Sequence, residues 1–182
     1  MADRGLTGVL LVGGASARFG SAKALARFDG ETLAERAWRI LGEACEERLA
    51  FGKATDGLEL PFDVLDDGID VRAPIAGVVA GLRAAETRVA VFLPVDCPLV
   101  TPDALRELAD ACADAAVPAS GPLPGAYAQT ALPMLEDRLA AGELALHGAL
   151  EQLDVRIVDL DGDLLANVNT ERDLDRLRAI TA

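Results

Sequence analysis

Apolar residues in this chain fall into short continuous runs that alternate with longer stretches of helical spacing. Val9–Val12 and Val89–Leu93 are apolar throughout, which predicts strands buried on both faces of a parallel sheet. Between them, Leu33–Cys45 places apolar residues three and four positions apart, which predicts a helix with one face on the core. The pattern therefore favours strands joined by crossover helices.

The remaining elements follow from the same patterns and from turn residues. Further strands are predicted at 48–51, 61–65, 115–119 and 155–160. Further helices are predicted at 22–28, from Pro74, at 102–113, 132–141 and 144–153, and after Thr170. The stretch 121–127 is predicted to be a loop or hairpin. The fold class that follows is α/β, with residues 1–182 forming a single domain. We expect a three-layer α/β/α, Rossmann-like arrangement around a mostly parallel sheet.

Two helix starts and one pair of glycines add local detail. Thr32 and Glu35 match a capping box, and Thr170 with Asp173 matches the cap of the last helix. Gly77 and Gly81 lie four residues apart on one face of the helix that begins at Pro74. This spacing predicts close packing of that helix on the sheet or on a flat ligand ring.

Composition narrows the class of protein. The chain is 51% apolar and 26% charged, as in a soluble globular protein. Its net charge of −13 argues against a nucleic-acid partner, because proteins that bind nucleic acid generally present a basic face. No stretch approaches the roughly 20 apolar residues of a membrane span, and the first residues do not resemble a secretion signal.

The cysteine and histidine content limits which disulfides and metal sites the chain can form. Cys45, Cys97 and Cys112 are odd in number and far apart, which indicates neither a disulfide framework nor a zinc site. His147 is the single histidine, which excludes a histidine-based metal centre; it is predicted to lie at the surface or at a pocket edge. A reduced, cytoplasmic setting is the expectation.

The first candidate for chemistry is the glycine-rich loop after the first strand. Gly13 and Gly14 let the backbone turn sharply, and Arg18 and Lys23 add positive charge beside free backbone N–H groups. Donors, cations and open space suit a polyphosphate. The loop fits neither the Walker A pattern nor the G-x-G-x-x-G fingerprint, so a tight turn that only permits close packing stays open as the alternative.

Carboxylates follow two other predicted strands. Ligands of open α/β sheets bind at the carboxyl ends of the strands, so the Gly13-Gly14 loop, the Asp66-Asp67 pair and Asp96 are expected to converge on one rim. Asp96, held between Pro94 and Pro98, is the candidate Mg²⁺ ligand. Asp67 is a candidate second ligand or a hydrogen-bond acceptor for a nucleotide. The alternatives are an Asp-x-Pro turn and an Asp-Asp-Gly surface turn.

Four ordered blocks make the chain similar to a known family. They are Leu11–Leu25 (LVGGASARFGSAKAL), Pro74–Leu82 (PIAGVVAGL), Pro94–Pro98 (PVDCP) and Asn167–Thr170 (NVNT). In this order, and over nearly the whole chain, they resemble the MobA-type nucleotidyltransferases, in particular the molybdenum cofactor guanylyltransferase branch. The first block is specific for the superfamily, and the four together are specific for the guanylyl branch.

The resemblance implies the nucleotidyltransferase type of this fold, an activity, and a role for each matching residue. The activity is Mg²⁺-dependent transfer of GMP from GTP to molybdopterin-bound molybdenum, with release of pyrophosphate. The residues of the GTP site would be Leu11, Val12, Gly13, Gly14, Lys23 and Asp67, with Arg18 assisting Lys23 at the phosphates. Asp96 would be the metal ligand. Asn167 and Asn169, together with the 122–127 loop, would lie towards the pterin. Transient partners would be molybdenum-insertion proteins or recipient molybdoenzymes.

The chain also departs from the family pattern. Ala73 stands where the family has Gly, and 48–53 lacks the family's Asn at the end of the second strand, so a guanine contact expected there does not carry over. Cytidylyl transfer to the same pterin is the nearest alternative activity. A sugar-phosphate nucleotidyltransferase and a non-catalytic nucleotide- or cofactor-binding module are the others.

Overall fold

A mixed sheet forms the centre of the computed structural model, which describes residues 5–13 and 22–181. Among these residues, seven strands run in the order β5-β4-β1-β6-β8-β7-β9. They are β1 (Thr7–Leu11), β4 (Glu47–Gly52), β5 (Leu65–Asp66), β6 (Val89–Pro94), β7 (Ala115–Pro118), β8 (Gly125–Ala128) and β9 (Val155–Val158). Every neighbouring pair is parallel except the two pairs that involve β8.

Strand β1 lies near the middle of the sheet and is buried on both faces. It pairs in parallel with β4 on one side and with β6 on the other, with Leu10 opposite Ala50 and Leu93. Successive side chains point to opposite faces, so Leu10 packs in one hydrophobic cluster and Val9 and Leu11 in the other. This confirms the burial that its continuous apolar run predicts.

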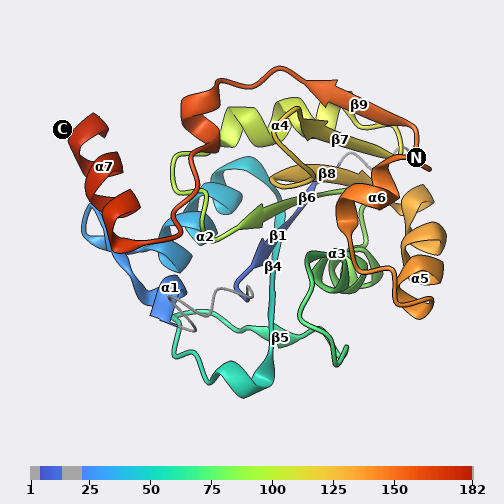
Figure 1. Cartoon of the computed structure of the whole chain (residues 1–182), viewed down its shortest axis with the longest axis horizontal. Coiled ribbons are helices and arrows are strands. Elements are labelled where there is room, and N and C mark those ends of the chain that lie inside the picture. Colours follow the sequence, from blue (N-terminus) through green and yellow to red (C-terminus); the bar gives the residue numbers. More distant parts are fainter. Residues whose placement is uncertain (1–4, 14–21, 182) are drawn as a thin grey trace.

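Helices cover both faces of this sheet (Figure 1). The α-helices are α1 (Ala22–Leu25), α2 (Leu33–Ala44), α3 (Pro74–Ala84), α4 (Pro102–Ala111), α5 (Leu132–Ala140), α6 (Leu146–Leu150) and α7 (Glu171–Thr181). The 3-10 turns are η1 (Ala54–Asp56), η2 (Gln129–Ala131) and η3 (Gly162–Leu165). Helices α2 and α4 pack on the Leu10 face, and α3, α5 and α6 pack on the opposite face. The predicted three-layer α/β/α architecture is confirmed.

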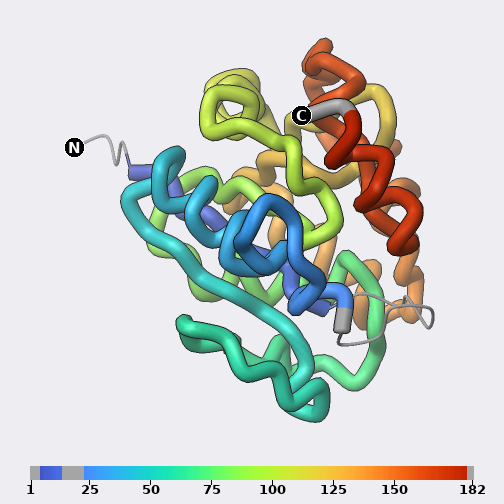
Figure 2. Tube along the Cα trace, turned by 90° about the vertical axis from the view of Figure 1, so that its left-hand side faces the viewer, coloured from blue at the N-terminus to red at the C-terminus, as the bar shows by residue number. Residues whose placement is uncertain are grey.

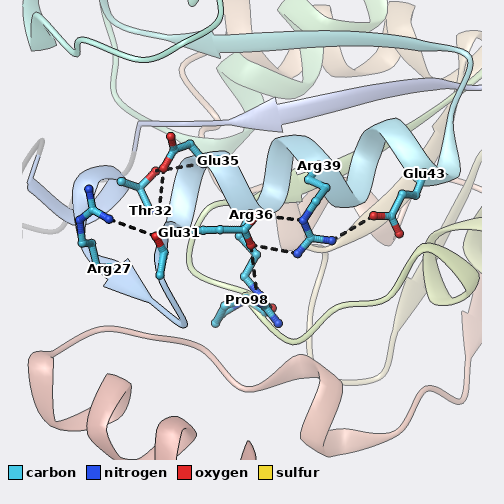
Figure 3. A network of polar contacts seen from close by, with 9 residues as sticks. Arg27, Glu31, Thr32, Glu35, Arg36, Arg39, Glu43 and Pro98 are labelled. Atoms are coloured by element: carbon cyan, nitrogen blue, oxygen red, sulfur yellow. Dashed lines mark hydrogen bonds and ion pairs between the residues drawn. The ribbon is translucent and has the colours of Figure 1, made fainter.

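Helix α2 shows how local sequence sets an element and fixes its neighbour (Figure 3). The Thr32 hydroxyl accepts the Glu35 N–H at 3.1 Å, and the Glu35 carboxylate accepts the Thr32 N–H at 2.9 Å, which is the predicted capping box. On the same helix, Arg36 Nε donates to the Pro98 carbonyl at 2.7 Å. Helix α2 therefore holds the turn that follows Asp96.

Helix α3 packs closely on the sheet through two glycines. A methyl group at Gly77 would lie 2.7 Å from a Leu11 side-chain carbon, and one at Gly81 would lie 2.6 Å from the Phe92 ring. The prediction of close packing on the sheet is thereby confirmed for both positions. The same approach brings the start of α3 next to the end of β1.

Several predicted elements are shorter or different in the structure. The helix expected at 22–28 ends at Leu25, after which β2 (Arg27–Phe28) pairs with β3 (Glu31–Thr32) in a small antiparallel hairpin. The strand expected at 61–65 is reduced to Leu65–Asp66, and the helix expected at 144–153 is reduced to α6. The 121–127 stretch, predicted as a loop or hairpin, belongs to the antiparallel hairpin of β7 and β8, and its second half enters β8, which lies between β6 and β7 in the sheet.

The C-terminal segment returns to the first third of the chain. Val168, Leu174 and Leu177 pack with Phe28 and Leu33 in a third hydrophobic cluster. The red helix α7 accordingly lies beside the blue 27–32 hairpin in Figure 1, and the teal segment between β4 and β5 forms the lower edge of the molecule in Figures 1 and 2. No helix within 5–13 and 22–181 is long and apolar enough to cross a membrane.

Candidate active site

The candidate active site lies where the parallel strands β4, β1 and β6 end. The backbones remain joined just beyond the strands: Val12 N–H donates to the Phe51 carbonyl, and Val95 N–H donates to the Leu11 carbonyl. Asp67 N–H likewise donates to the Gly52 carbonyl. The residues that follow β1, β5 and β6 are therefore held on one rim, as the sequence predicts.

Lys23 and Asp96 form the polar centre of this rim. The Lys23 side chain comes from α1 and is 9% exposed, and its Nζ donates to Asp96 Oδ2 at 3.0 Å. The same Nζ donates to Asn169 Oδ1 at 3.2 Å, just before α7 begins. Three segments that are distant in the sequence thus supply one cluster. The sequence predicted each of these residues separately, and the structure brings them into direct contact.

Cys97 and the 167–168 segment make further hydrogen bonds next to this cluster. The Cys97 thiol lies 2.9 Å from Asn167 Oδ1, to which it donates, and Val168 N–H donates to the Asp96 carbonyl at 2.8 Å. Burial first, and the Asp96 carboxylate second, raise the pKa of the Cys97 thiol well above its ordinary value. The thiol is therefore protonated at neutral pH and acts as a hydrogen-bond donor rather than as a nucleophile.

A cavity of about 230 Å³ opens over the Lys23–Asp96 pair. Lys23, Asp96, Cys97 and Asn167 line it, together with Leu123 from the loop before β8. A second cavity of about 160 Å³ lies on the β4 side and is lined by Lys53, Asp67 and Gly77, among others. Leu11, Gly13 and Pro74 line both cavities, so the two are adjacent along the rim.

The second cavity contains a buried ion pair. Lys53 Nζ donates to Asp67 Oδ1 at 2.6 Å, and the two side chains are 12% and 8% exposed. Lys53 Nζ also donates to the Ile69 carbonyl, while Ile69 N–H donates to Asp67 Oδ1 at 3.0 Å. The pair joins the loop after β4 to the loop after β5.

Most of the predicted site residues line the two cavities. They are Leu11, Val12, Gly13, Lys23, Asp67, Asp96 and Asn167, and Asn169 contacts Lys23. Gly14 and Arg18 lie outside the described residues. Of the 122–127 loop, Leu123 reaches the cavity, whereas Tyr127 is fully buried in β8 with its hydroxyl bonded to the Pro122 carbonyl. Tyr127 therefore belongs to the core.

Three residues of this rim, Lys53, Arg72 and Cys97, are not among the site residues that the sequence predicts. Arg72 lines the second cavity and pairs with Asp56 at 2.6 Å. The available signal is position, because Lys53 follows the end of β4 directly and Cys97 is next to Asp96, just beyond the end of β6.

The residues present fit a hard divalent cation. Mg²⁺ is held by one or two carboxylates and completes its shell with water and phosphate oxygens. The Asp96 side chain is 27% exposed and lines the cavity, so its carboxylate is accessible to a ligand. No cluster of three His, Cys, Asp or Glu residues that could hold a metal occurs in the described part of the chain. A metal at this site would therefore depend on Asp96 and on oxygen atoms of the substrate.

Fold and site together define a class: an α/β nucleotidyltransferase with its cleft at the carboxyl end of a mostly parallel sheet. The family model described as "MobA-like NTP transferase domain" matches residues 8–156. The chain belongs to this family of nucleotidyltransferases.

Relatives and a solved structure agree with this membership. The chain is 36% identical over 182 residues to the probable molybdenum cofactor guanylyltransferase of Deinococcus radiodurans, covering 94% of this chain and 93% of the relative. It is 32% identical to the protein of the same name from Chloroflexus aggregans, covering 96% and 94%. The crystal structure of molybdopterin-guanine dinucleotide biosynthesis protein A from Archaeoglobus fulgidus superposes with a TM-score of 0.81 at 26% identity, covering 96% and 98%.

Proposed function

We propose that the protein transfers GMP from GTP to molybdopterin-bound molybdenum and releases pyrophosphate. The observation that carries this proposal is the Lys23–Asp96–Asn169 cluster, whose lysine and aspartate line a cavity on the strand-end rim. A cation and a carboxylate side by side suit a triphosphate and its metal ion. The relatives named as guanylyltransferases support the choice of nucleotide.

The reaction requires positioning and charge stabilisation rather than a covalent enzyme intermediate. A terminal phosphate oxygen of the pterin attacks the α-phosphorus of GTP. The bond from that phosphorus to the bridging oxygen of the β-phosphate breaks, and pyrophosphate leaves with the electron pair. The protein contributes by aligning the two substrates and by stabilising negative charge.

Each residue of the cluster has a proposed task. The Lys23 ammonium neutralises the phosphates, and Asn169, which contacts its Nζ, orients it. Asp96 would hold Mg²⁺, which when bound supplies charge neutralisation at phosphate oxygens. Asn167 and Leu123 would lie towards the pterin, since both line the cavity of Lys23 and Asp96 and neither lines the cavity of Lys53. The product would pass to molybdenum-insertion proteins or recipient molybdoenzymes in the cytoplasm.

Pyrophosphate release tests the proposal. With molybdopterin and Mg²⁺ present, the protein is expected to release pyrophosphate from GTP and not from CTP. Release from CTP alone would identify a cytidylyltransferase. Nucleotide binding without pyrophosphate release would identify a non-catalytic binding module.

A further inference from the structure

We propose that Cys97 is a positioning residue for the second substrate. Its thiol orients the Asn167 carboxamide so that the amide N–H groups face the cavity, where they hold a phosphate oxygen of the pterin. This inference rests on the proposed function, in which Asn167 lies towards the pterin. It adds a buried side chain that acts through another residue rather than on a substrate directly.

The Cys97 thiol has a fixed position in the turn after β6. The residue is 1% exposed and packs in the hydrophobic cluster on the Leu10 face of the sheet. Its backbone N–H donates to the Pro94 carbonyl at 3.3 Å, and its carbonyl accepts from Val100 N–H at 3.4 Å. A side chain that is enclosed and whose backbone is bonded on both sides can hold a neighbouring group in one orientation.

The single hydrogen of the thiol has two acceptors within reach, and the distances favour Asn167. The sulfur lies 2.9 Å from Asn167 Oδ1 and 3.6 Å from Asp96 Oδ1. The two segments are held in this register by the backbone, because Val168 N–H donates to the Asp96 carbonyl at 2.8 Å. The hydrogen bond to Asn167 is therefore the one that the thiol makes.

This hydrogen bond decides which side of the Asn167 amide is left for a ligand. A carboxamide has a carbonyl oxygen on one side and an NH₂ group on the other. Asn167 is exposed, and its side chain makes no other hydrogen bond in the described part of the chain. With its carbonyl bound to Cys97, the NH₂ group is free to donate into the cavity that both residues line. Two N–H donors suit a phosphate oxygen, which only accepts.

Two other roles for Cys97 predict different results. A cysteine that only fills space affects stability, and its loss weakens both substrates equally or neither of them. A cysteine that acts on the Asp96 carboxylate changes the Mg²⁺ concentration that the reaction needs. Orientation of Asn167 instead changes the KM for the pterin alone, and the effect disappears when the Asn167 side chain is absent.

Assays of pyrophosphate release, with molybdopterin, GTP and Mg²⁺ varied in turn, test the inference. In Cys97→Ala the KM for molybdopterin is expected to rise about fivefold to tenfold, with the KM for GTP and the Mg²⁺ requirement within about twofold of wild type. Cys97→Ser keeps a hydroxyl donor and is expected to return the pterin KM to within about twofold of wild type. Cys112→Ala is the control, because this partly buried thiol donates to the Ala113 carbonyl at 3.7 Å and lines neither cavity.

A double-mutant cycle shows whether Cys97 acts through Asn167. Asn167→Ala is expected to raise the pterin KM by itself, because it removes the amide donor. Adding Cys97→Ala to that protein is then expected to raise the pterin KM no further, since the thiol has no amide left to orient. Two effects that multiply would show that Cys97 acts by another route.

The outcomes separate this inference from the proposed function. If wild type is active but Cys97→Ala keeps the pterin KM, raises the KM for GTP equally, or multiplies with Asn167→Ala, the inference is overturned while the function stands. If Cys97→Ala does not fold, Cys97→Val, which fills the space without a donor, is measured against the same expectations. If wild type releases no pyrophosphate from GTP with molybdopterin present, the proposed function fails and this inference fails with it.

Discussion

Lys23 and Asp96 form an ion pair with each other at the candidate active site. Each is an ionised group with limited access to water, and each would be costly to bury alone. The contact therefore keeps both side chains in place until a substrate provides phosphate oxygens for the ammonium and a metal ion for the carboxylate. Asn169 limits the movement of Lys23, because it accepts a second hydrogen bond from the same nitrogen.

Replacing Asp96 tests whether its carboxylate holds a metal ion. Asp96→Asn keeps the size of the side chain and an oxygen for Lys23 but removes the negative charge that a metal ion requires. We expect kcat to fall by about a hundredfold or more, with the thermal unfolding midpoint little changed, in an assay of pyrophosphate release. Asp103→Asn, at a side chain that is 93% exposed on α4, is the matched control. Turnover like that of wild type in Asp96→Asn would contradict the metal assignment.

The sequence predicts the residues of this site better than it predicts their contacts. Glycines at one strand end, a lysine shortly after them and an aspartate at another strand end indicate a phosphate site, because strand ends share a rim. The contact between Lys23 and Asp96 spans 73 positions, and the contact between Lys23 and Asn169 spans 146. No local pattern encodes such pairings, since they depend on how the C-terminal segment returns to the sheet.

At the scale of elements, continuous apolar runs predict strands reliably, whereas strands built from small residues are hard to recognise in the sequence. The runs at β1 and β6 are confirmed because burial on both faces requires them. Strand β8 has the sequence Gly-Ala-Tyr-Ala after a proline-rich turn, a composition that is typical of loops. It is a strand because the gap between β6 and β7 supplies partners on both sides, which is tertiary context.

The cap of α7 connects an element boundary to the site. Asp173 Oδ2 accepts the N–H groups of Asn169 and Thr170 at 2.9 and 2.8 Å, and it accepts the Thr170 hydroxyl at 3.0 Å. These hydrogen bonds, with the one from the Asn169 backbone first, hold the pKa of Asp173 below its usual 3.8. The cap thereby fixes the backbone of Asn169, whose side chain contacts Lys23.

The lowered pKa of Asp173 sets the sign of a pH dependence. The ionised carboxylate stabilises the fold above the unfolded pKa of about 3.8, and that contribution is lost as the pH falls through the lower folded value. Asp173→Asn is therefore expected to unfold at lower urea concentration than wild type from about pH 7 to about pH 5, with the difference shrinking below about pH 4. Urea titrations across this range measure it, and Asp175→Asn on the same helix leaves the cap intact. A difference that does not vary with pH would show that the charge of Asp173 has no part in the cap.

At the scale of the whole molecule, acidic residues outnumber basic ones. The chain carries 30 acidic and 17 basic residues. On the strand-end rim the cations Lys23, Lys53 and Arg72 are each paired with a carboxylate, of Asp96, Asp67 and Asp56, so these pairs do not offset the net charge of −13. The excess charge has a cost, since like charges repel one another in the compact state.

That repulsion predicts how salt affects stability. At pH 7 the net charge is −13, and added salt screens repulsion across the surface over a Debye length of about 10 Å at 0.1 M. We expect the thermal unfolding midpoint to rise by a few degrees between about 20 and 200 mM NaCl, because screening outweighs the loss from exposed ion pairs, which contribute little each. Near pH 4, where the carboxylates begin to protonate and the net charge approaches zero, the same salt increase should leave the midpoint unchanged or lower it. Calorimetry at both pH values measures the effect. A midpoint that falls with salt at pH 7 would mean that paired charges, and not the net charge, dominate the electrostatic free energy of this fold.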